Sequence, residues 1–224
     1  MGKRFENAKK EVDANKVYGM EEGIALAKKT STTKFAGNIE AHIRLGIDAK
    51  KTDQAVRGTV TLPHGTGKTK RIAAFISSGK EKEAQDAGAA VVGGEELIKK
   101  IKETEKLDFD IAIAEPAMMA KLAQIAKILG PKGLMPNPKT GTVSQDIGKT
   151  VKEFAAGKVE FKNDESGNVH ILLGKASFPD EQLLANLKAF LEALNGVKPA
   201  GLKKEYIQAA TVHATMGPGI KVKV

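Results

Sequence analysis

Apolar and polar residues alternate strictly along residues 38–47, where isoleucine, alanine and leucine occupy every second position. A period of two places successive side chains on opposite faces, so this pattern predicts a half-buried strand with one face in water. Residues 57–62 have the same character and follow a polar turn, which predicts an antiparallel pair with the first strand.

The same alternation of apolar and polar residues is found near the other end of the chain. Residues 158–163 and 168–173 are strand-like and flank Asp164–Gly167, a sequence typical of a hairpin turn. Residues 205–214 predict a further strand, which a glycine-rich segment interrupts at 215–219. Helical spacing is found in residues 3–30, with a second helix starting near Met20, and in residues 180–194.

The middle of the chain has a different pattern, in which short, wholly apolar runs alternate with helical segments. Such alternation predicts βαβ units and a parallel sheet covered on both faces. The expected strands are residues 71–76, 89–92 and 109–114, and the expected helices are residues 80–87, 95–104, 116–129 and 147–156.

These two patterns, alternating strands near both ends and apolar runs between helices in the middle, predict two domains. Residues 1–66 and 158–224 form a discontinuous α+β domain with an antiparallel sheet. Residues 67–157 form an inserted Rossmann-like, three-layer α/β/α domain with a parallel sheet. The fold class is thus α/β and α+β combined, and the two chain crossings place a hinge at Gly65, Gly67 and Gly157.

Composition narrows the function. The 224 residues carry a net charge of +9, and the terminal segments hold more of this excess than the middle. A basic balance favours a polyanionic partner, with nucleic acid ahead of a membrane surface, although a basic enzyme has the same balance. There is no cysteine, no signal peptide and no apolar run of about 20 residues, so we expect a cytoplasmic protein without a membrane partner.

Gly65–Thr69 resembles the end of a phosphate-binding loop and raises the alternative of a nucleotide-dependent enzyme. That loop requires a glycine where this chain has Leu62, and a helix where residues 70–76 predict a strand. We therefore interpret the segment as a glycine hinge. A general basic chaperone of nucleic acid remains a third alternative.

The four histidines, His42, His64, His170 and His213, form no metal pair at close spacing. Three of them lie on predicted strands, where a solvent- or RNA-facing role is favoured over catalysis. We expect no catalytic residue, no metal and no cofactor.

Polar side chains on the alternating strands suggest a four-stranded sheet that displays a surface for structured RNA. Aromatic residues make up only 4% of the chain and tryptophan is absent, so base stacking is not the expected mode. Recognition by shape, phosphate and 2′-hydroxyl contacts fits better. The residues concerned are Glu40, His42, Glu160, Lys162, His170 and Thr211.

Several strings of the chain resemble one family along nearly its whole length, the bacterial large-subunit ribosomal protein one, which forms the mobile stalk. The matching strings are Lys34–Phe35, Glu40–Asp48, Val56–Gly65, Gly130–Pro138, Gly174–Phe178 and Thr215–Pro218. Leu62–Gly65 and Gly130–Pro138 are the most specific of them.

This resemblance implies a structural protein of the large ribosomal subunit that binds 23S ribosomal RNA, assists release of E-site tRNA and represses its own operon by binding the mRNA. A monomer is expected when the protein is free. The discontinuous domain carries most RNA contacts in this family. By matching position, the contacts come from Lys34, Phe35, Glu40, Glu160, Lys162, Thr215, Met216 and Gly217, with His42, Asp164, His170 and Lys175 beside them.

Overall fold

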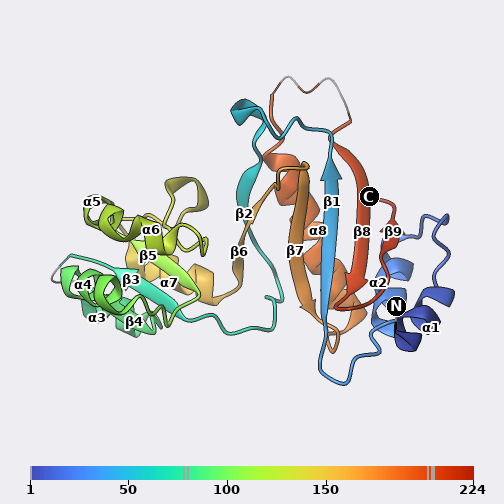
Figure 1. Cartoon of the computed structure of the whole chain (residues 1–224), viewed down its shortest axis with the longest axis horizontal. Coiled ribbons are helices and arrows are strands. Elements are labelled where there is room, and N and C mark those ends of the chain that lie inside the picture. The colour runs from blue at the N-terminus through green and yellow to red at the C-terminus, as the bar shows by residue number, and fades with distance from the viewer. Residues whose placement is uncertain (1, 78, 80, 201, 203–204) are drawn as a thin grey trace. The chain divides into compact units, whose positions relative to one another are not determined.

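A computed structural model describes residues 2–77, 79, 81–200, 202 and 205–224. The chain folds into two compact units, unit 1 with residues 1–67 and 159–224, and unit 2 with residues 68–158. Helices and strands are mixed in a two-domain α/β fold, with an antiparallel sheet in unit 1 and a separate parallel sheet of three strands in unit 2 (Figure 1).

Unit 1 is built around a four-stranded antiparallel sheet in the order β7-β1-β8-β9. A second, two-stranded sheet joins β2 to β6. The elements are α1 (Lys3–Lys10), α2 (Met20–Lys29), β1 (Asn38–Leu45), η1 (Thr52–Gln54), β2 (Arg57–Thr61), β6 (Lys158–Lys162), β7 (Asn168–Lys175), α8 (Asp180–Gly196), β8 (Ile207–Ala214) and β9 (Ile220–Val222).

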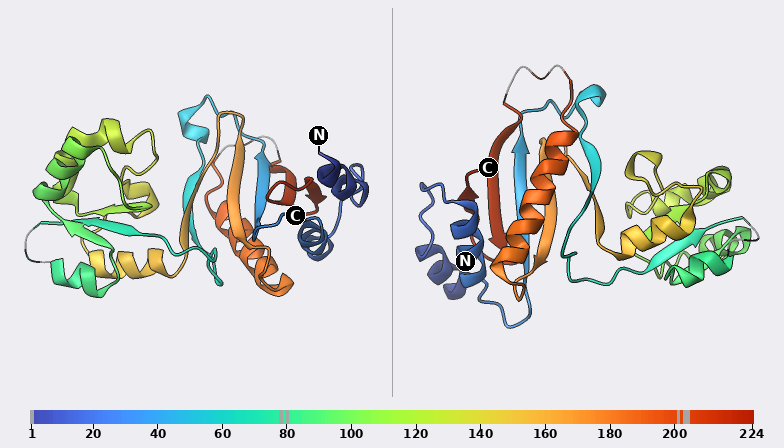
Figure 2. Two further views of the ribbon diagram at one scale, coloured as in Figure 1. Left: turned by 60° about the horizontal axis from the view of Figure 1, so that its bottom comes forward. Right: turned by 180° about the vertical axis from the view of Figure 1, so that it is seen from behind.

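The central strand β1 comes from the N-terminal segment and lies between two strands from the C-terminal segment. Burial alternates along β1, as its sequence predicts, with Ile39, Ala41 and Ile43 buried and the residues between them partly exposed. Helices α2 and α8 pack against the buried face, since their buried residues share one apolar cluster with those of β1, and α8 lies over the sheet in the view from behind (Figure 2). The opposite face of the sheet carries polar side chains, and no helix lies over it among the described residues of unit 1 (Figure 1).

The charges of α2 favour a helix at this position. Glu21 and Glu22 lie in its first turn, and Lys28 and Lys29 lie in its last turn, which complements the helix dipole at both ends. Helix α8 likewise begins with Asp180 and Glu181 directly after Pro179. Its apolar residues pack into the core of unit 1, where Phe161 meets Phe190 edge to face.

Unit 2 contains a parallel sheet in the order β4-β3-β5. Alternate residues of β3 enter two separate apolar clusters, since Ala73 and Phe75 belong to one and Ile72 and Ala74 to the other. The elements are β3 (Ile72–Phe75), α3 (Glu81–Asp86), β4 (Val91–Gly93), α4 (Glu95–Thr104), β5 (Ile111–Ala114), η2 (Pro116–Met118), α5 (Met119–Leu122), η3 (Ala123–Ile125), α6 (Ala126–Leu129), η4 (Pro138–Thr140) and α7 (Ile147–Ala155).

Three expectations need correction. Residues 57–61 do not pair with β1, because β7 and β8 occupy both edges of that strand, and β2 pairs with β6 instead. Residues 158–163 and 168–173 flank the expected turn but share only an isolated bridge, between Asn163 and Val169. The segment 116–129 is not one helix but a series of short α and 3-10 turns.

The remaining predicted elements occur close to their expected places, and α4 has the predicted bounds. Lys80, the expected first residue of the helix at 80–87, lies outside the described residues. Over the part of the chain that the structure describes, none of the helices combines the length and the apolar character needed to cross a membrane.

Candidate nucleic-acid interface

The open face of the four-stranded sheet is the surface to which the candidate site residues lead. Strand register aligns one row of side chains across it, His170 on β7, His42 on β1, Thr211 on β8 and Lys221 on β9. All four side chains are at least partly exposed. A polar row four strands wide provides a broad surface for a partner.

Neighbouring rows extend this surface. Arg44 on β1 aligns with Asn168 on β7, and Glu40 aligns with His213 on β8. Sequence reasoning did not select Arg44 or Lys221 as site residues. The alternation of residues 38–47 could have identified Arg44, but the side on which Lys221 lies depends on the pairing of β9 with β8.

One end of the sheet brings together segments that are far apart in the sequence. The backbone N–H of Asn38 donates to Thr215 Oγ1 (3.0 Å), and the N–H of Thr215 donates to the Asn38 carbonyl (2.8 Å). The N–H of Ala176, after β7, donates to the carbonyl of Gly37 (2.9 Å). The loop at residues 31–37 is thus bound to the end of β7 through Gly37, and Asn38, which follows it, is bound to the end of β8.

Two large apolar side chains are exposed at this end. Phe35 in the loop has a relative exposure of 60%, and Met216 in the turn after β8 has 65%. Met216 also has a left-handed backbone with φ of 63°. A non-glycine residue in this conformation is uncommon and stores strain, which often accompanies a binding role.

The structure therefore places most predicted site residues on one surface. Lys34, Phe35, Lys175, Thr215, Met216 and Gly217 lie at this end of the sheet, and Glu40, His42, His170 and Thr211 lie on its open face. Asp164 adjoins His170, with its Oδ2 3.2 Å from His170 Nε2. Backbone N–H donation from Asn168 and Ser166 to its carboxylate holds the pKa of Asp164 well below its usual range.

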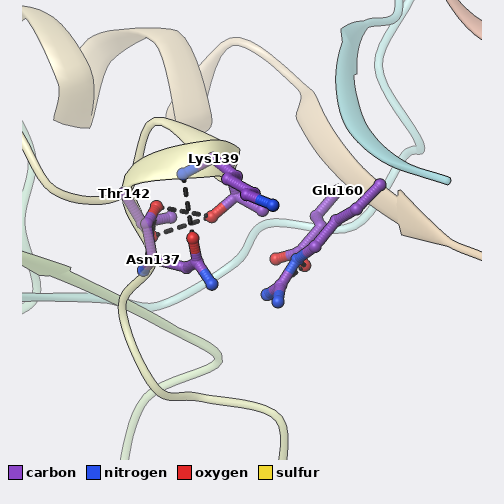
Figure 3. A network of polar contacts seen from close by, with 6 residues as sticks. Asn137, Lys139, Thr142 and Glu160 are labelled. Carbon is purple, nitrogen blue, oxygen red and sulfur yellow. Dashed lines mark hydrogen bonds and ion pairs between the residues drawn. The ribbon is translucent and has the colours of Figure 1, made fainter. Parts of the chain in front are cut away.

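Glu160 and Lys162 lie elsewhere. Both belong to β6 in the two-stranded sheet, so they are not on the four-stranded sheet as expected. Glu160 Oε1 pairs with Arg57 on β2, 2.7 Å from Nε and 2.6 Å from a terminal guanidinium nitrogen. The carboxylate thus orients a neighbouring arginine. Glu160 is labelled among the side chains drawn in Figure 3.

Three histidines form a chain on the open face. His42 Nδ1 lies 2.5 Å from His170 Nδ1, and His42 Nε2 lies 2.5 Å from His213 Nε2. Burial is the main cause that lowers the pKa of His42, followed by the electrostatic effect of the two neighbouring histidines. Their separation in the sequence hid this cluster, because only the strand register brings the rings together.

Unit 2 contains the specific string Gly130–Pro138, which ends in a local polar network (Figure 3). Asn137 accepts the N–H of Lys139 on its side chain (2.8 Å), and its own N–H donates to Thr142 Oγ1 (2.8 Å). Thr140 and Thr142 are both buried and donate to the Asn137 carbonyl. The string thus closes its own loop.

The expected hinge glycines have left-handed backbones, with φ of 59° at Gly65, 70° at Gly67 and 111° at Gly157. Glycine adopts this region without a steric penalty, which fits these turns. Residues 72–75, which follow Gly65–Thr69, form strand β3 and not a helix. The requirement of a phosphate-binding loop is therefore not met there.

Comparison with known proteins shows which chains this one is similar to. The sequence profile of the family described as "Ribosomal protein L1p/L10e family" matches residues 27–218. The large ribosomal subunit protein uL1 of Mesoplasma florum is 51% identical over 224 residues, which is all of this chain and 98% of that protein. The uL1 protein of Thermosipho africanus is 49% identical over 220 residues, covering 98% of this chain and 95% of the relative.

Proposed function

Because the chain belongs to the ribosomal protein L1p/L10e family, we propose that it binds 23S ribosomal RNA directly, through the open face of its four-stranded sheet. Members of this family are structural proteins of the large ribosomal subunit and not enzymes, and this context implies a place on the cytoplasmic ribosome.

One observation carries the proposal. Segments from both ends of the chain build one sheet with a buried face and a polar face, and Phe35 and Met216 project at its end. Burying these apolar side chains against RNA removes their area from water, while the polar rows beside them provide hydrogen bonds. A folded RNA with a matching shape satisfies both requirements.

The charges on this surface suggest how each group acts. Lys34, Arg44, Lys175 and Lys221 are placed to neutralise phosphates, which makes affinity depend on salt through the release of counterions. Thr211 and Asn168 can bond to 2′-hydroxyl groups on the shallow groove of an RNA helix. Thr215 and Gly217 present hydroxyl and backbone groups to sugars at close range.

Affinity measurements with full-length transcripts test the proposal. We expect the protein to bind 23S ribosomal RNA and to discriminate strongly against 16S ribosomal RNA at equal salt. Equal binding to both transcripts would favour the alternative of a general basic chaperone. We expect no binding of ATP or GTP, and such binding would favour the alternative of a nucleotide-dependent enzyme.

A pair of substitutions that introduces negative charge tests where the RNA binds. Phe35→Asp combined with Met216→Asp puts two carboxylates against the RNA backbone, so we expect binding to fall by more than about 100-fold. Val17→Asp is the matched control, because Val17 is also exposed (57%) and lies outside the loop and the turn. Unchanged affinity of the paired variant would place the RNA on another surface.

We extend the proposal to the roles that membership of this family suggests: a mobile stalk that helps release E-site tRNA, and repression of the protein's own operon through its mRNA. Repression requires the mRNA to occupy the surface that binds ribosomal RNA. We therefore expect the leader of the operon mRNA to compete with 23S ribosomal RNA for the protein, and expect the Phe35 and Met216 variant to bind neither.

We also propose that units 1 and 2 act as a discontinuous RNA-binding domain and an inserted Rossmann-like, three-layer domain, with a hinge at Gly65, Gly67 and Gly157. The compactness of each unit and the left-handed glycines support this division. Two residues of β6 remain proposed RNA contacts. Glu160 acts through Arg57, with which it is paired, and Lys162 neutralises a phosphate. We also propose that the free protein is a monomer, which a molar mass measured by light scattering would test.

A further inference from the structure

The histidine chain on the open face ends at two fixed acceptors. At one end His213 Nδ1 lies 2.8 Å from the carbonyl oxygen of Ala214, which accepts a proton and cannot supply one. At the other end His170 Nε2 lies 3.2 Å from Asp164 Oδ2, the oxygen of an ionised carboxylate. Both terminal ring nitrogens must therefore carry their hydrogen.

When the three rings carry one hydrogen each, these acceptors determine their tautomers. With its proton on Nε2, His170 presents a lone pair at Nδ1, so His42 Nδ1 donates to it across 2.5 Å. Neutral His42 then has a lone pair at Nε2. Neutral His213, with its proton on Nδ1, also has a lone pair at Nε2.

Two lone pairs consequently face each other, since His42 Nε2 and His213 Nε2 are 2.5 Å apart. A positive centre between the two nitrogens, which is either an added proton or a metal ion, stabilises this arrangement. Glu40 on β1 stands opposite His213, and its carboxylate and the two imidazoles have ligand atoms that all lie within 4.8 Å of one another.

We propose that Glu40, His42 and His213 bind a divalent transition-metal ion of the zinc class on the open face of the sheet. Two imidazoles and a carboxylate are ligands that zinc accepts in a tetrahedral site. Nitrogens bound to zinc at ~2.05 Å lie about 3.3 Å apart in such a site, so the two rings separate by less than about 1 Å. All three side chains are half-buried on the open face of the sheet.

The neighbours of this site support metal binding as well. A metal-bound histidine donates its other ring N–H to an acceptor that fixes its tautomer. His42 has such an acceptor in His170, which is itself held by Asp164, and His213 has one in the Ala214 carbonyl. The core occupies the other side of the sheet, so the fourth position faces solvent and can hold water.

An ion here would also change the charge of the open face. Without an ion, Glu40 contributes a negative charge to a surface proposed to bind RNA. A bound divalent ion would make the group of Glu40, His42 and His213 net positive. This consequence rests on the proposed function, whereas metal binding itself does not.

Calorimetric titration of the metal-free, full-length protein with ZnCl2, in the absence of RNA, tests the site. We expect a single site on the wild-type protein that does not respond to Mg²⁺, a hard cation that prefers oxygen ligands. His42→Ala and His213→Ala should each abolish it, Glu40→Gln should weaken it, and His170→Ala should weaken it by about tenfold through the lost tautomer. His64→Ala is the matched control, because His64 lies outside the cluster, and it should bind as the wild type does.

Imidazole ¹⁵N spectra of the wild-type protein give a second measurement that needs no variant. Zinc should shift Nε2 of His42 and of His213 and leave both nitrogens of His64 unchanged. No zinc-dependent shift, together with protonation of these Nε2 atoms on acidification, would show that only a proton occupies the gap and would overturn the proposal. Binding that survives His42→Ala combined with His213→Ala would overturn it too. Because RNA is absent from both measurements, failure here leaves the proposed RNA binding untouched.

Discussion

Asn38 and Thr215 are 177 positions apart in the chain, yet the N–H of Asn38 donates to Thr215 Oγ1 at 3.0 Å and the N–H of Thr215 donates to the Asn38 carbonyl at 2.8 Å. These bonds join the start of β1 to the turn after β8. They hold the loop that carries Phe35 beside the turn that carries Met216, and so define one end of the proposed RNA surface.

Replacement of Thr215 by valine removes the side-chain acceptor of the Asn38 N–H while keeping a similar shape. We expect a loss of about 1 kcal/mol in the free energy of unfolding, because the two hydrogen bonds of the Thr215 hydroxyl with Asn38 are lost near the surface. We also expect weaker binding of 23S ribosomal RNA, measured by filter retention. Thr215→Ser retains the hydroxyl and should retain both properties. Unchanged stability and RNA affinity in Thr215→Val would show that the hydroxyl matters for neither.

Replacement of Met216 by glycine should separate stability from binding. The left-handed backbone at Met216 (φ 63°) costs a side-chain-bearing residue roughly 1 kcal/mol, which glycine avoids. We therefore expect thermal stability to stay equal or to rise, while RNA affinity falls because the exposed side chain is gone. A variant that binds RNA normally would mean that Met216 makes no contact.

Lys221 gives a test of the salt dependence. Its side chain lies on the open face, in the row that crosses Thr211 and His42. If it neutralises one phosphate, Lys221→Gln should lower the slope of log affinity against log salt by about 1, with an effect that is similar for every RNA that binds. The matched control is Lys10→Gln, on the exposed side of α1, which should leave the slope unchanged.

Asn186 should be important for stability. It is fully buried on α8, accepts the N–H of His64 (3.1 Å) and donates to the carbonyls of Gly65 (2.9 Å) and Leu173 (2.7 Å). Asn186→Ala leaves these groups without their partner, so we expect a loss of roughly 2–4 kcal/mol in urea unfolding. A loss below about 0.5 kcal/mol would show that water replaces the amide.

Tyr206 should make the protein sensitive to alkaline pH. Burial raises the pKa of its hydroxyl from 10.0 to about 12, and the hydroxyl donates to the Leu194 carbonyl. A raised folded-state pKa means that the contribution to stability is complete below pH 10 and is lost as the pH rises towards 12. Unfolding by urea at pH 9 and pH 11.5 should show a decline, on the order of 1 kcal/mol, that Tyr206→Phe lacks.

The sequence by itself determined much about this protein. Alternation along residues 38–47 predicted a strand with one buried face, because a period of two is a local property of the backbone, and β1 has that burial pattern. The apolar runs near Ile72 and Ile111 predicted parallel strands covered on both sides for a similar reason. The strings at Leu62–Gly65 and Gly130–Pro138 indicated the family that the comparisons show.

Only the tertiary structure decided which strands are neighbours. The expected pairing of residues 57–62 with residues 38–47 was wrong, because strands from the C-terminal segment compete for both edges of β1 and long-range pairing leaves no local signal. Strand pairing also placed Glu160 on a separate sheet. The register of the four-stranded sheet put Arg44 and Lys221 on its open face and brought the rings of His42, His170 and His213 together. Side-chain chemistry that spans several strands depends on register, and register is fixed by the packing of the whole core.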